Sequence, residues 1–592
     1  MKLKVKNIRN ACPRPEAIFS WEEGAQRRWL VFSRPVETLQ AFRPDEIPGL
    51  LELAEDHARQ GGWAAGFLSY EASPAFDPSF RVRPPSPLPL AWFGLYPQAG
   101  EIASPFDLPA GPFHLGKWIP SLKRREYEDK IKRIKRLIAD GDTYQVNYTF
   151  RLRASFQGDP LGLWLRLVAA QPRGRPAFFD TGRFAILSAS PELFFYRDRN
   201  GGIVCRPMKG TARRGLTAAG DREEMEKLAA SGKNRAENLM IVDMIRNDLG
   251  KIAFPGMVKT QKLFSVEKHP TLLQMTSTVT AVSPSSLKDV MAALFPCASV
   301  TGAPKIRAME IIAETEKDPR GVYTGTVGVV APGGESRFNV AIRTATVDNE
   351  LGEAVYGTGG GIVWDSRPRS EYSEALLKSS ILFSKPVEFE LLETLRWEKG
   401  KGYFLLEEHI SRLVESAQYF DFPVDPARIR RKLNRYALSF RSSLLMVRLK
   451  LDRQGKIHLE HNTLSPKEKP WKLALAEKPV DPRDPFLYHK TTHREVYEQA
   501  RAGRPDCDDV ILFNSRGQVT ETTRANLVVK WEGRYCTPPV KCGLLDGVYR
   551  KRLLKEGVIT ERDITLEELK RCRQVFLVNS VRKWIPAARI KW

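Results

Sequence analysis

Residues 337–363 read RFNVAIRTATVDNELGEAVYGTGGGIV, and this stretch indicates the fold class of the longer part of the chain. Its two runs rich in β-branched residues, 337–347 and 354–363, predict strands. The same patterns predict further strands and long helices elsewhere, at 184–188, 193–196, 221–249 and 371–383. We therefore expect a domain of mixed α and β structure.

The chain has 592 residues, which is too long for one hydrophobic core, because single cores stop growing at roughly 250–300 residues. A fresh series of strand, helix and strand patterns follows the string Ser384-Lys385-Pro386, at 388–397, 408–419 and 444–451. The expected domains are residues 1–383, with 1–115 as an N-terminal part, and residues 387–592.

The composition is that of a globular protein, with 42% apolar and 28% charged residues. A net charge of +23 allows a polyanion partner, but the basic residues come in short groups interleaved with acids, as on a solvated surface. We expect no nucleic-acid partner. The sequence contains no run of about 18 apolar residues, so it predicts no membrane span. The scattered cysteines, Cys12 among them, lack zinc-ligand spacing, which favours reduced thiols in the cytoplasm.

Glutamates on two helical patterns are candidates for holding a hard cation. Glu237 lies in a helical run at 236–249, and Glu371 and Glu374 share one face of another. Each also has an ordinary structural explanation. Glu374 precedes Lys378 by four residues, as in a surface ion pair, and Glu237 could be an acid at a helix start.

Two features of 337–363 could bind a carboxylate. The glycines 357 and 359–361 lack Cβ atoms, so backbone N–H groups there could approach a ligand closely, although a tight turn would use the same residues. Arg343 is a charge within an apolar strand-like run and needs a partner. That partner is either a ligand or an internal salt bridge.

Eight ordered strings together resemble the chorismate-utilising enzymes. They are 141–147 (GDTYQVN), 190–194 (SPELF), 206–211 (RPMKGT), 236–238 (AEN), 299–305 (SVTGAPK), 323–325 (YTG), 341–344 (AIRT) and 371–374 (EYSE). The resemblance implies a mixed α and β sandwich. It also implies a substrate, chorismate, and a cofactor, Mg²⁺.

By this resemblance, Glu237 and Glu374 hold Mg²⁺, which holds the ring carboxylate of chorismate. Tyr323 and Arg343 would bind the enolpyruvyl carboxylate. The ring site would be lined by Thr301 and the backbone of Gly359, Gly360 and Gly361.

Lys209 separates two members of that family. Anthranilate synthases have alanine there, whereas aminodeoxychorismate synthases have a lysine, which is implied to attack ring carbon 2 as the 4-hydroxyl leaves. Glu192 resembles the acid that protonates this hydroxyl. Gln274 replaces a histidine linked to pyruvate elimination, which fits a domain that stops at aminodeoxychorismate. Ammonia is expected from a separate glutaminase, because no Gly-x-Cys-x-Gly string occurs.

In residues 387–592, Lys490 is the lysine whose context suits a Schiff base, since it follows an apolar pair and precedes a helical run. Glu521 could pair with a pyridine nitrogen. A single lysine is a weak signal, and Glu521 could instead be a turn-flanking acid.

The strings 409–413 (HISRL), 488–492 (YHKTT), 519–526 (VTETTRAN) and 543–550 (GLLDGVYR) resemble the fold-type IV pyridoxal-phosphate enzymes. The resemblance implies an α/β domain in which Arg412 binds the cofactor phosphate and Leu545 packs on its ring. Backbone amides near Val548 and Tyr549 would complete the phosphate site. Tyr549 stands where many relatives have threonine, so one hydroxyl contact to phosphate would be missing.

Together the two resemblances imply synthesis of 4-aminobenzoate: amination of chorismate, then pyridoxal-phosphate-dependent elimination of pyruvate. A D-amino-acid or branched-chain aminotransferase is the alternative for the second domain. The pattern is also compatible with a homodimer through that domain. A non-catalytic binding module and a nucleic-acid-binding protein are the alternatives from other classes, and the combined candidate residues disfavour both.

Overall fold

The computed structural model describes the chain except residues 1–5, 8–13, 24–25, 270–271, 384–386 and 466–468. Cys12 and the string at 384–386 thus lie outside the described residues, and the other cysteines are free thiols. The chain forms two compact units, Met1–Arg213 with Met225–Pro386, and Arg214–Glu224 with Val387–Trp592. The segment Arg214–Glu224, which the sequence places in the first domain, belongs by its contacts to the second unit.

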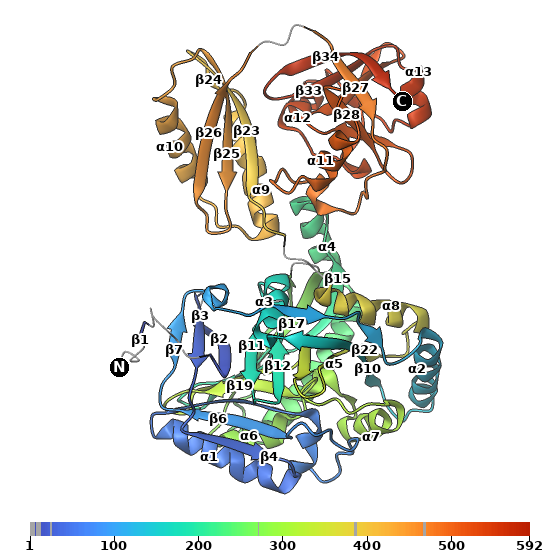
Figure 1. Cartoon of the computed structure of the whole chain (residues 1–592). Helices are drawn as coiled ribbons and strands as arrows, with labels where there is room; N and C mark the ends of the chain where they lie inside the picture. The colour runs from blue at the N-terminus through green and yellow to red at the C-terminus, as the bar shows by residue number, and fades with distance from the viewer. Residues whose placement is uncertain (1–5, 8–13, 24–25, 270–271, 384–386, 466–468) are drawn as a thin grey trace. The chain divides into compact units, whose positions relative to one another are not determined.

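Two large sheets build the first unit (Figure 1). The first has the order β1 (Lys6–Asn7), β7 (Gly100–Ile102), β3 (Gln26–Phe32), β2 (Ala17–Glu23), β11 (Ala177–Asp180), β12 (Phe184–Ser188), β21 (Thr344–Asp348), β22 (Glu353–Ile362), β10 (Gln145–Gly158) and β18 (Gly302–Ala303), with β8 (Phe113–Leu115) and β9 (Ile119–Pro120) also on β10. The second has the order β15 (Met208–Arg213), β17 (Leu272–Val282), β14 (Gly202–Cys205), β13 (Leu193–Arg197), β20 (Ser336–Val340), β19 (Thr326–Val330), β5 (Trp63–Leu68), β6 (Ala91–Tyr96) and β4 (Glu37–Ala41), with β16 (Lys259–Lys268) on β17.

The two sheets pack face to face through one aromatic-rich cluster. It includes Phe19 and Phe179 from the first sheet and Phe67 and Trp92 from the second. Helices cover the outer faces: α2 (Arg124–Ala139), α3 (Pro160–Ala170), α7 (Lys305–Thr315) and α8 (Pro368–Lys378) pack on the first sheet, and α1 (Ile47–Arg59), α5 (Gly232–Gly250) and α6 (Leu287–Leu294) on the second. The expected mixed α and β sandwich is confirmed, and residues 1–115 give strands to both sheets.

The run 337–347, expected as one strand, is two strands in different sheets. β20 ends at Val340 and lies in the second sheet, whereas β21 begins at Thr344 and lies in the first. Arg343 occupies the break with a φ of 51°, a left-handed conformation that interrupts a strand. The expectation of a charge inside a continuous strand is therefore wrong.

The pattern at 221–249 is likewise two helices, α4 (Ala218–Ala230) and α5. Ser231 separates them, and its side chain accepts a hydrogen bond from the Asn234 backbone N–H, as an N-cap does. Because α5 begins at Gly232, Glu237 lies more than one turn inside it. The alternative interpretation of Glu237 as a helix-start acid is therefore wrong.

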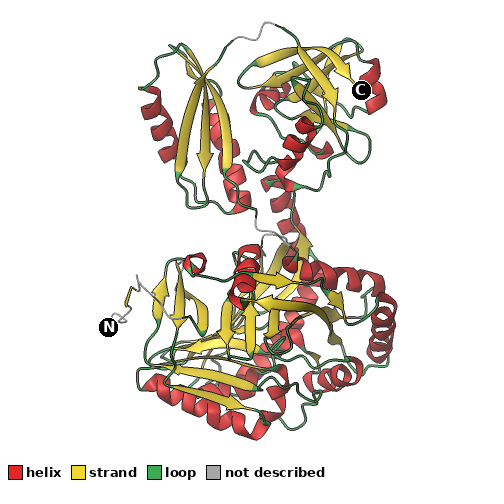
Figure 2. Ribbon diagram, in the orientation of Figure 1, coloured by secondary structure: helices red, strands yellow, loops and turns green. Residues whose placement is uncertain are grey.

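The second unit has a small and a large sheet, both flanked by helices (Figure 2). The small sheet has the order β24 (Gly402–Tyr403), β23 (Leu391–Glu398), β25 (Leu444–Leu451) and β26 (Ile457–Thr463), and shares a core with α9 (Leu406–Phe420) and α10 (Pro426–Ala437). The large sheet has the order β29 (Val519–Thr522), β28 (Asp509–Phe513), β27 (Trp471–Leu475), β34 (Lys583–Lys591), β33 (Val575–Asn579), β30 (Asn526–Trp531), β31 (Arg534–Thr537) and β32 (Thr560–Glu561), and its helices are α11 (Glu495–Ala502), α12 (Val548–Lys555) and α13 (Leu566–Arg571).

A buried ionic network ties α7 to β10 in the first unit. The Glu316 carboxylate accepts hydrogen bonds from the Thr149 backbone N–H and hydroxyl, both at 2.9 Å, and from Arg320 at 2.6 and 3.1 Å. Arg151 lies 3.5 Å from the same carboxylate. The side chains of Glu316, Arg151 and Arg320 are each at most 2% exposed, so one carboxylate compensates two buried cations.

We predict that Glu316→Gln destabilises the first unit by about 3–5 kcal/mol, because it leaves two buried guanidinium groups without their counter-charge. Urea unfolding followed by circular dichroism measures the loss. The matched control is Asp45→Asn, which removes a carboxylate that is 71% exposed and should change stability by less than about 0.5 kcal/mol. Equal midpoints for Glu316→Gln and the parent chain would contradict the role given to this network.

Candidate active sites

The glycines of β22 line the centre of the first unit. β22 pairs with β10 from Val146–Ile362 to Ser155–Glu353, whereas on its other side β21 pairs only as far as Tyr356. A Cβ atom on Gly357 would lie 2.1 Å from the Tyr323 ring, and one on Gly361 would lie 2.8 Å from Lys209 Nζ. Gly357 leaves the space that the Tyr323 ring occupies, and a side chain at Gly361 would displace the Lys209 amine.

Lys209 lies on β15, where three polar side chains hold its backbone. Asn238 Nδ2 donates to the Lys209 carbonyl at 3.4 Å and accepts from Ser277 Oγ through its own oxygen at 2.5 Å. Gln274 Nε2 donates to the next carbonyl, that of Gly210, at 2.9 Å. Loss of hydration lowers the pKa of Lys209, and the neighbouring Lys378 ammonium lowers it further. A lowered pKa is what a lysine needs in order to act as a neutral nucleophile.

Glu237 and Glu374, from different helices, both influence Lys209 electrostatically, in the direction that raises its pKa. Each carboxylate faces a lysine four residues away on its own helix: Lys378 Nζ lies 2.9 Å from Glu374, and Lys233 Nζ lies 3.9 Å from Glu237. The surface-pair geometry considered for Glu374 is therefore present. The Glu374 side chain is 46% exposed, but Lys378 also donates to the Gly359 carbonyl of β22 at 3.2 Å, so the pair lies at the edge of the glycine strand.

These carboxylates are compatible with Mg²⁺. No group of three or more His, Cys, Asp or Glu side chains suited to a metal occurs among the described residues. Mg²⁺ in enzymes commonly takes only one or two protein carboxylates and completes its coordination with water and substrate oxygens. Glu237 and Glu374, which both act electrostatically on Lys209, fit that donor set.

Glu192 is the second titratable group close to Lys209. Burial raises the pKa of Glu192 to about 7, against the lowering effects of the Ser299 hydroxyl and the Lys209 ammonium. The side chain is 3% exposed, and its Oε1 has no hydrogen-bond partner among the described residues. A carboxyl that keeps its proton near neutral pH can act as a general acid.

The remaining candidates of the first unit surround the same strand. The buried Tyr323 ring lies 5.2 Å from the Arg151 guanidinium. Arg343 donates to Gln171 and has no carboxylate partner among the described residues, so the salt-bridge alternative is not supported. The Thr301 carbonyl accepts from the Asn147 N–H at 2.7 Å, opposite Gly361, although its hydroxyl bonds to the Cys297 and Ala298 carbonyls.

In the second unit, the Lys490 backbone lies beside β23 of the small sheet. Its carbonyl accepts from the Leu392 N–H of β23 at 2.9 Å. Loss of hydration lowers the pKa of Lys490 to about 8, and the cations of Arg412 and Arg494 act in the same direction. This amine is therefore more often neutral than a surface lysine, as Schiff-base formation requires.

Glu521 lies in β29 and is held by three donors. Tyr497 Oη donates to Oε1 at 2.9 Å, the Leu545 N–H donates to the same oxygen at 3.2 Å, and Asn526 Nδ2 donates to Oε2 at 3.2 Å. Burial raises the pKa of Glu521 to about 7. A carboxyl fixed in this way suits a pyridine nitrogen better than the turn-flanking role, since that role needs no burial.

Arg412 lies on α9 beside the N-terminus of α12. Its Nε and Nη2 donate to Glu393 at 2.9 and 2.7 Å, and its Nη1 donates to the Asp546 carbonyl at 3.4 Å. The Arg412 guanidinium therefore binds Glu393 through two of its nitrogens, and only Nη1 contacts the residues that precede α12. Val548 and Tyr549 open that helix, where backbone N–H groups lack intrahelical partners and suit an anion. The Tyr549 ring packs on Phe404.

These residues fit pyridoxal phosphate: a lysine with a lowered pKa, a fixed buried carboxyl, and an arginine at a helix N-terminus. The structure brings Leu545 to this site through its backbone N–H, which holds Glu521.

Three residues that the sequence did not single out belong to these sites. Glu393 is a buried acid next to the buried Leu391 and Leu392 in β23, and an acid in that apolar setting could have signalled a role. The Gln145 side chain is fully buried beside Gly361, with both amide atoms lacking partners among the described residues. Lys378 was considered only as a surface partner of Glu374, because its contact with β22 is invisible in the sequence.

Known proteins resemble both units. Residues 16–384 match the model of the chorismate binding enzymes, and residues 390–590 match that of the class IV aminotransferases. Aminodeoxychorismate synthase component 1 of Salmonella typhimurium is 43% identical over 339 residues, which are 57% of this chain and 69% of that protein. The relative of the same name from Escherichia coli is 41% identical over 44% of this chain and 57% of its own length.

A solved structure of the menaquinone-specific isochorismate synthase of Escherichia coli covers 62% of this chain and 88% of its own, with 18% identity and a TM-score of 0.50, and thus shares the fold. Among the helices of the described residues, none combines the length and apolar composition needed to cross a lipid bilayer. The family model covers most of the first unit and more than half of the chain. The chain therefore belongs to the chorismate-binding enzymes, with a second region of the class IV aminotransferase type fused behind the first.

Proposed function

We propose that the chain makes 4-aminobenzoate from chorismate and ammonia in two steps, one in each unit. The observation that carries the first step is Lys209, an amine with a lowered pKa between Glu192 and the glycines of β22. The names of the relatives, aminodeoxychorismate synthase component 1, support the same step.

In the first step, Lys209 attacks ring carbon 2 of chorismate while the 4-hydroxyl leaves with a proton from Glu192. Ammonia then adds at carbon 4 and expels the lysine amine, which gives aminodeoxychorismate. Arg343 and Tyr323 hold the enolpyruvyl carboxylate, with Thr301 and the backbone of Gly359–Gly361 along the ring. Glu237 and Glu374 hold Mg²⁺, which would neutralise the ring carboxylate when bound.

In the second step, Lys490 is the base that removes the proton from carbon 4 of aminodeoxychorismate, and pyruvate leaves as the ring becomes aromatic. Glu521 holds a proton at the cofactor's pyridine nitrogen. Arg412 and the N–H groups at the start of α12 bind the phosphate. Bound pyridoxal phosphate would supply an electron sink for this elimination.

We also propose that ammonia comes from a separate glutaminase subunit. The sequence contains no Gly-x-Cys-x-Gly string, and the relatives are named as one component of an enzyme. A cytoplasmic location and a homodimer through the second unit belong to the same proposal. Free cysteines support the location.

Lys209→Ala should slow amination of chorismate by more than ~10³-fold, because it removes the nucleophile. Chorismate, ammonium and Mg²⁺ are supplied, and aminodeoxychorismate is measured by chromatography. The control is Lys132→Ala, a lysine of the same unit that is 63% exposed, which should keep the parent rate. Full activity of Lys209→Ala would remove this residue from the mechanism.

The alkaline limb of the amination pH profile should come from Glu192. Its raised pKa keeps the carboxyl protonated below about pH 7, so the supply of general acid is lost as the pH rises through that value. The kcat/KM for chorismate should therefore fall above about pH 7, and fall below the range in which Lys209 becomes protonated. Glu192→Gln should lower kcat/KM by ~10²–10⁴-fold and abolish the alkaline limb; an unchanged limb would assign it to another group.

Lys490→Ala should accumulate aminodeoxychorismate from chorismate and ammonium, with no 4-aminobenzoate or pyruvate, because the second step loses its base. Lys401→Ala, at a lysine that is 75% exposed, is the matched control and should form both products. The match to class IV aminotransferases keeps one competing function open. Rapid transamination of D- or branched-chain amino acids by the parent chain, without pyruvate release from aminodeoxychorismate, would establish that alternative.

A further inference from the structure

The segment Arg214–Glu224 belongs to the second unit although its sequence lies inside the first domain. It directly follows β15, the strand of Lys209. An internal ion pair shapes the segment. Arg214 Nε donates to both carboxylate oxygens of Asp221, at 2.9 and 2.8 Å, and Asp221 also accepts from the Gly215 N–H at 2.8 Å. The Arg214 and Asp221 side chains are 7% and 4% exposed, so the pair is structural and not a solvated surface contact.

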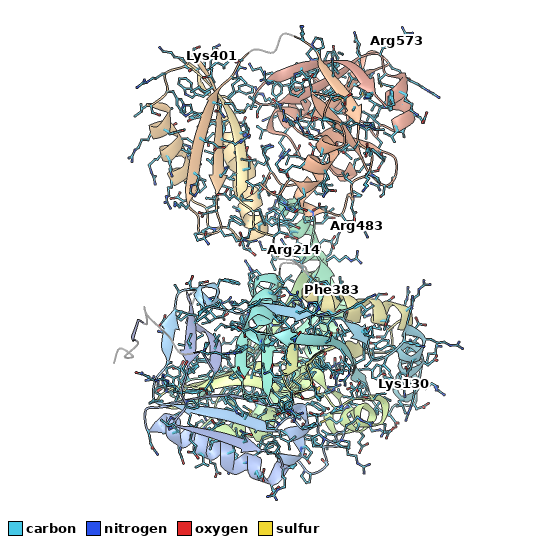
Figure 3. All side chains as sticks on the ribbon, viewed as in Figure 1. Lys130, Arg214, Phe383, Lys401, Arg483 and Arg573 are labelled. Carbon is cyan, nitrogen blue, oxygen red and sulfur yellow. The ribbon has the colours of Figure 1, made fainter. Side chains whose placement is uncertain are left out.

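Arg214 also binds the C-terminal end of α9 within the second unit. Its Nη2 donates to the Tyr419 carbonyl at 2.9 Å, and its guanidinium lies 4.3 Å from the Tyr419 ring centroid. Tyr419 Oη donates in return to the Gly215 carbonyl at 2.8 Å. The last carbonyls of a helix lack intrahelical donors and carry partial negative charge, so a buried cation there is doubly favourable. Figure 3 labels Arg214.

The residues on that end of α9 enclose His489, the neighbour of Lys490. The Tyr419 ring stacks on the His489 ring at 4.3 Å, Phe420 meets it edge-on at 4.9 Å, and Ser416 Oγ lies 3.0 Å from His489 Nδ1. Burial lowers the pKa of His489 to about 4, so the enclosed ring is neutral. The peptide before Lys490 is thus fixed by α9, the helix that also carries Arg412.

The segment has an apolar anchor as well. Leu216 packs against the cluster that contains Leu487, Tyr488 and Tyr497. Tyr488 is two residues before Lys490, and Tyr497 donates to Glu521. Arg214 therefore contacts α9 by charge, and Leu216 contacts the residues that precede Lys490 by apolar packing.

We propose that Arg214–Glu224 is a positioning element of the second active site, in which Arg214 fixes the end of α9 and thereby His489 and the Lys490 peptide. This inference rests on the proposed cofactor role of Lys490. It makes the second step dependent on residues that lie in sequence between Lys209 and Glu237, outside residues 387–592.

The test uses full-length chains and measures the two steps separately. Arg214→Ala should raise the Kd for pyridoxal phosphate, read from the visible absorbance of the bound cofactor, by about tenfold. The rate of pyruvate release from supplied aminodeoxychorismate should fall with it. Amination of chorismate should stay within about twofold of the parent rate. Arg213→Ala, at the exposed preceding residue, is the matched control and should change neither step.

Two further variants keep the inference testable if Arg214→Ala unfolds the second unit. Arg214→Lys keeps a cation for the Tyr419 carbonyl but loses the two-pronged contact with Asp221, and should give an intermediate Kd. Tyr419→Phe removes only the hydroxyl bond to Gly215 and should give a smaller increase. A purely structural segment would lower the unfolding temperature of these variants and leave the cofactor Kd of the folded chain unchanged.

Parent-like cofactor affinity and pyruvate release in Arg214→Ala would overturn the inference alone. An equal loss of both steps would overturn it too, by assigning the segment to Lys209 instead. A parent chain that binds no pyridoxal phosphate would reject the proposed second step and this inference together.

Discussion

Loss of hydration at two lysine amines is the constraint on which both units are organised. A surface lysine is protonated at neutral pH and cannot attack carbon, so the roles proposed for Lys209 and Lys490 require burial of each amine without full compensation of its charge. Burial lowers the pKa of Lys209, whose amine packs against Gly361, and the Lys378 ammonium lowers it further. At Lys490, burial and the cations of Arg412 and Arg494 lower the pKa to about 8. The same physical requirement is met on two unrelated folds.

Each lysine has a nearby carboxyl whose pKa is shifted in the opposite direction: Glu192 near Lys209 and Glu521 near Lys490. Burial raises the pKa of Glu192 and that of Glu521 to about 7. The pKa values of Lys490 and Glu521, about 8 and about 7, therefore lie close together near neutral pH, which suits groups that exchange protons. Ion pairing shifts the pKa of a buried carboxyl in the opposite direction. Glu393 contacts Arg412 and His409, and these contacts lower its pKa to about 2. Buried carboxyls in one protein thus differ in protonation according to their donors.

The candidate residues of both sites could be named from the sequence because they occur in ordered strings, and their roles stay predictions. Lys209, Glu192 and Glu237 were recognised in this way, as were Lys490 and Glu521. Predictions from local patterns were wrong where the chain passes from one sheet to the other. Arg343 reads as part of a continuous strand, yet the chain leaves one sheet for the other at this residue. Apolar periodicity is the same in both sheets, so it gives no signal of the crossing.

The sequence by itself determined the two-part organisation, the mixed α and β class and the candidates for the reacting groups, because these depend on residue type and order. Tertiary structure decided which groups meet. Lys378 reaches β22 and Gln145 lies beside Lys209 only because β10, β22 and α8 pack together. The assignment of Arg214–Glu224 to the second unit is of the same kind. Contacts between distant segments follow from packing and backbone pairing, which no local pattern of side chains encodes.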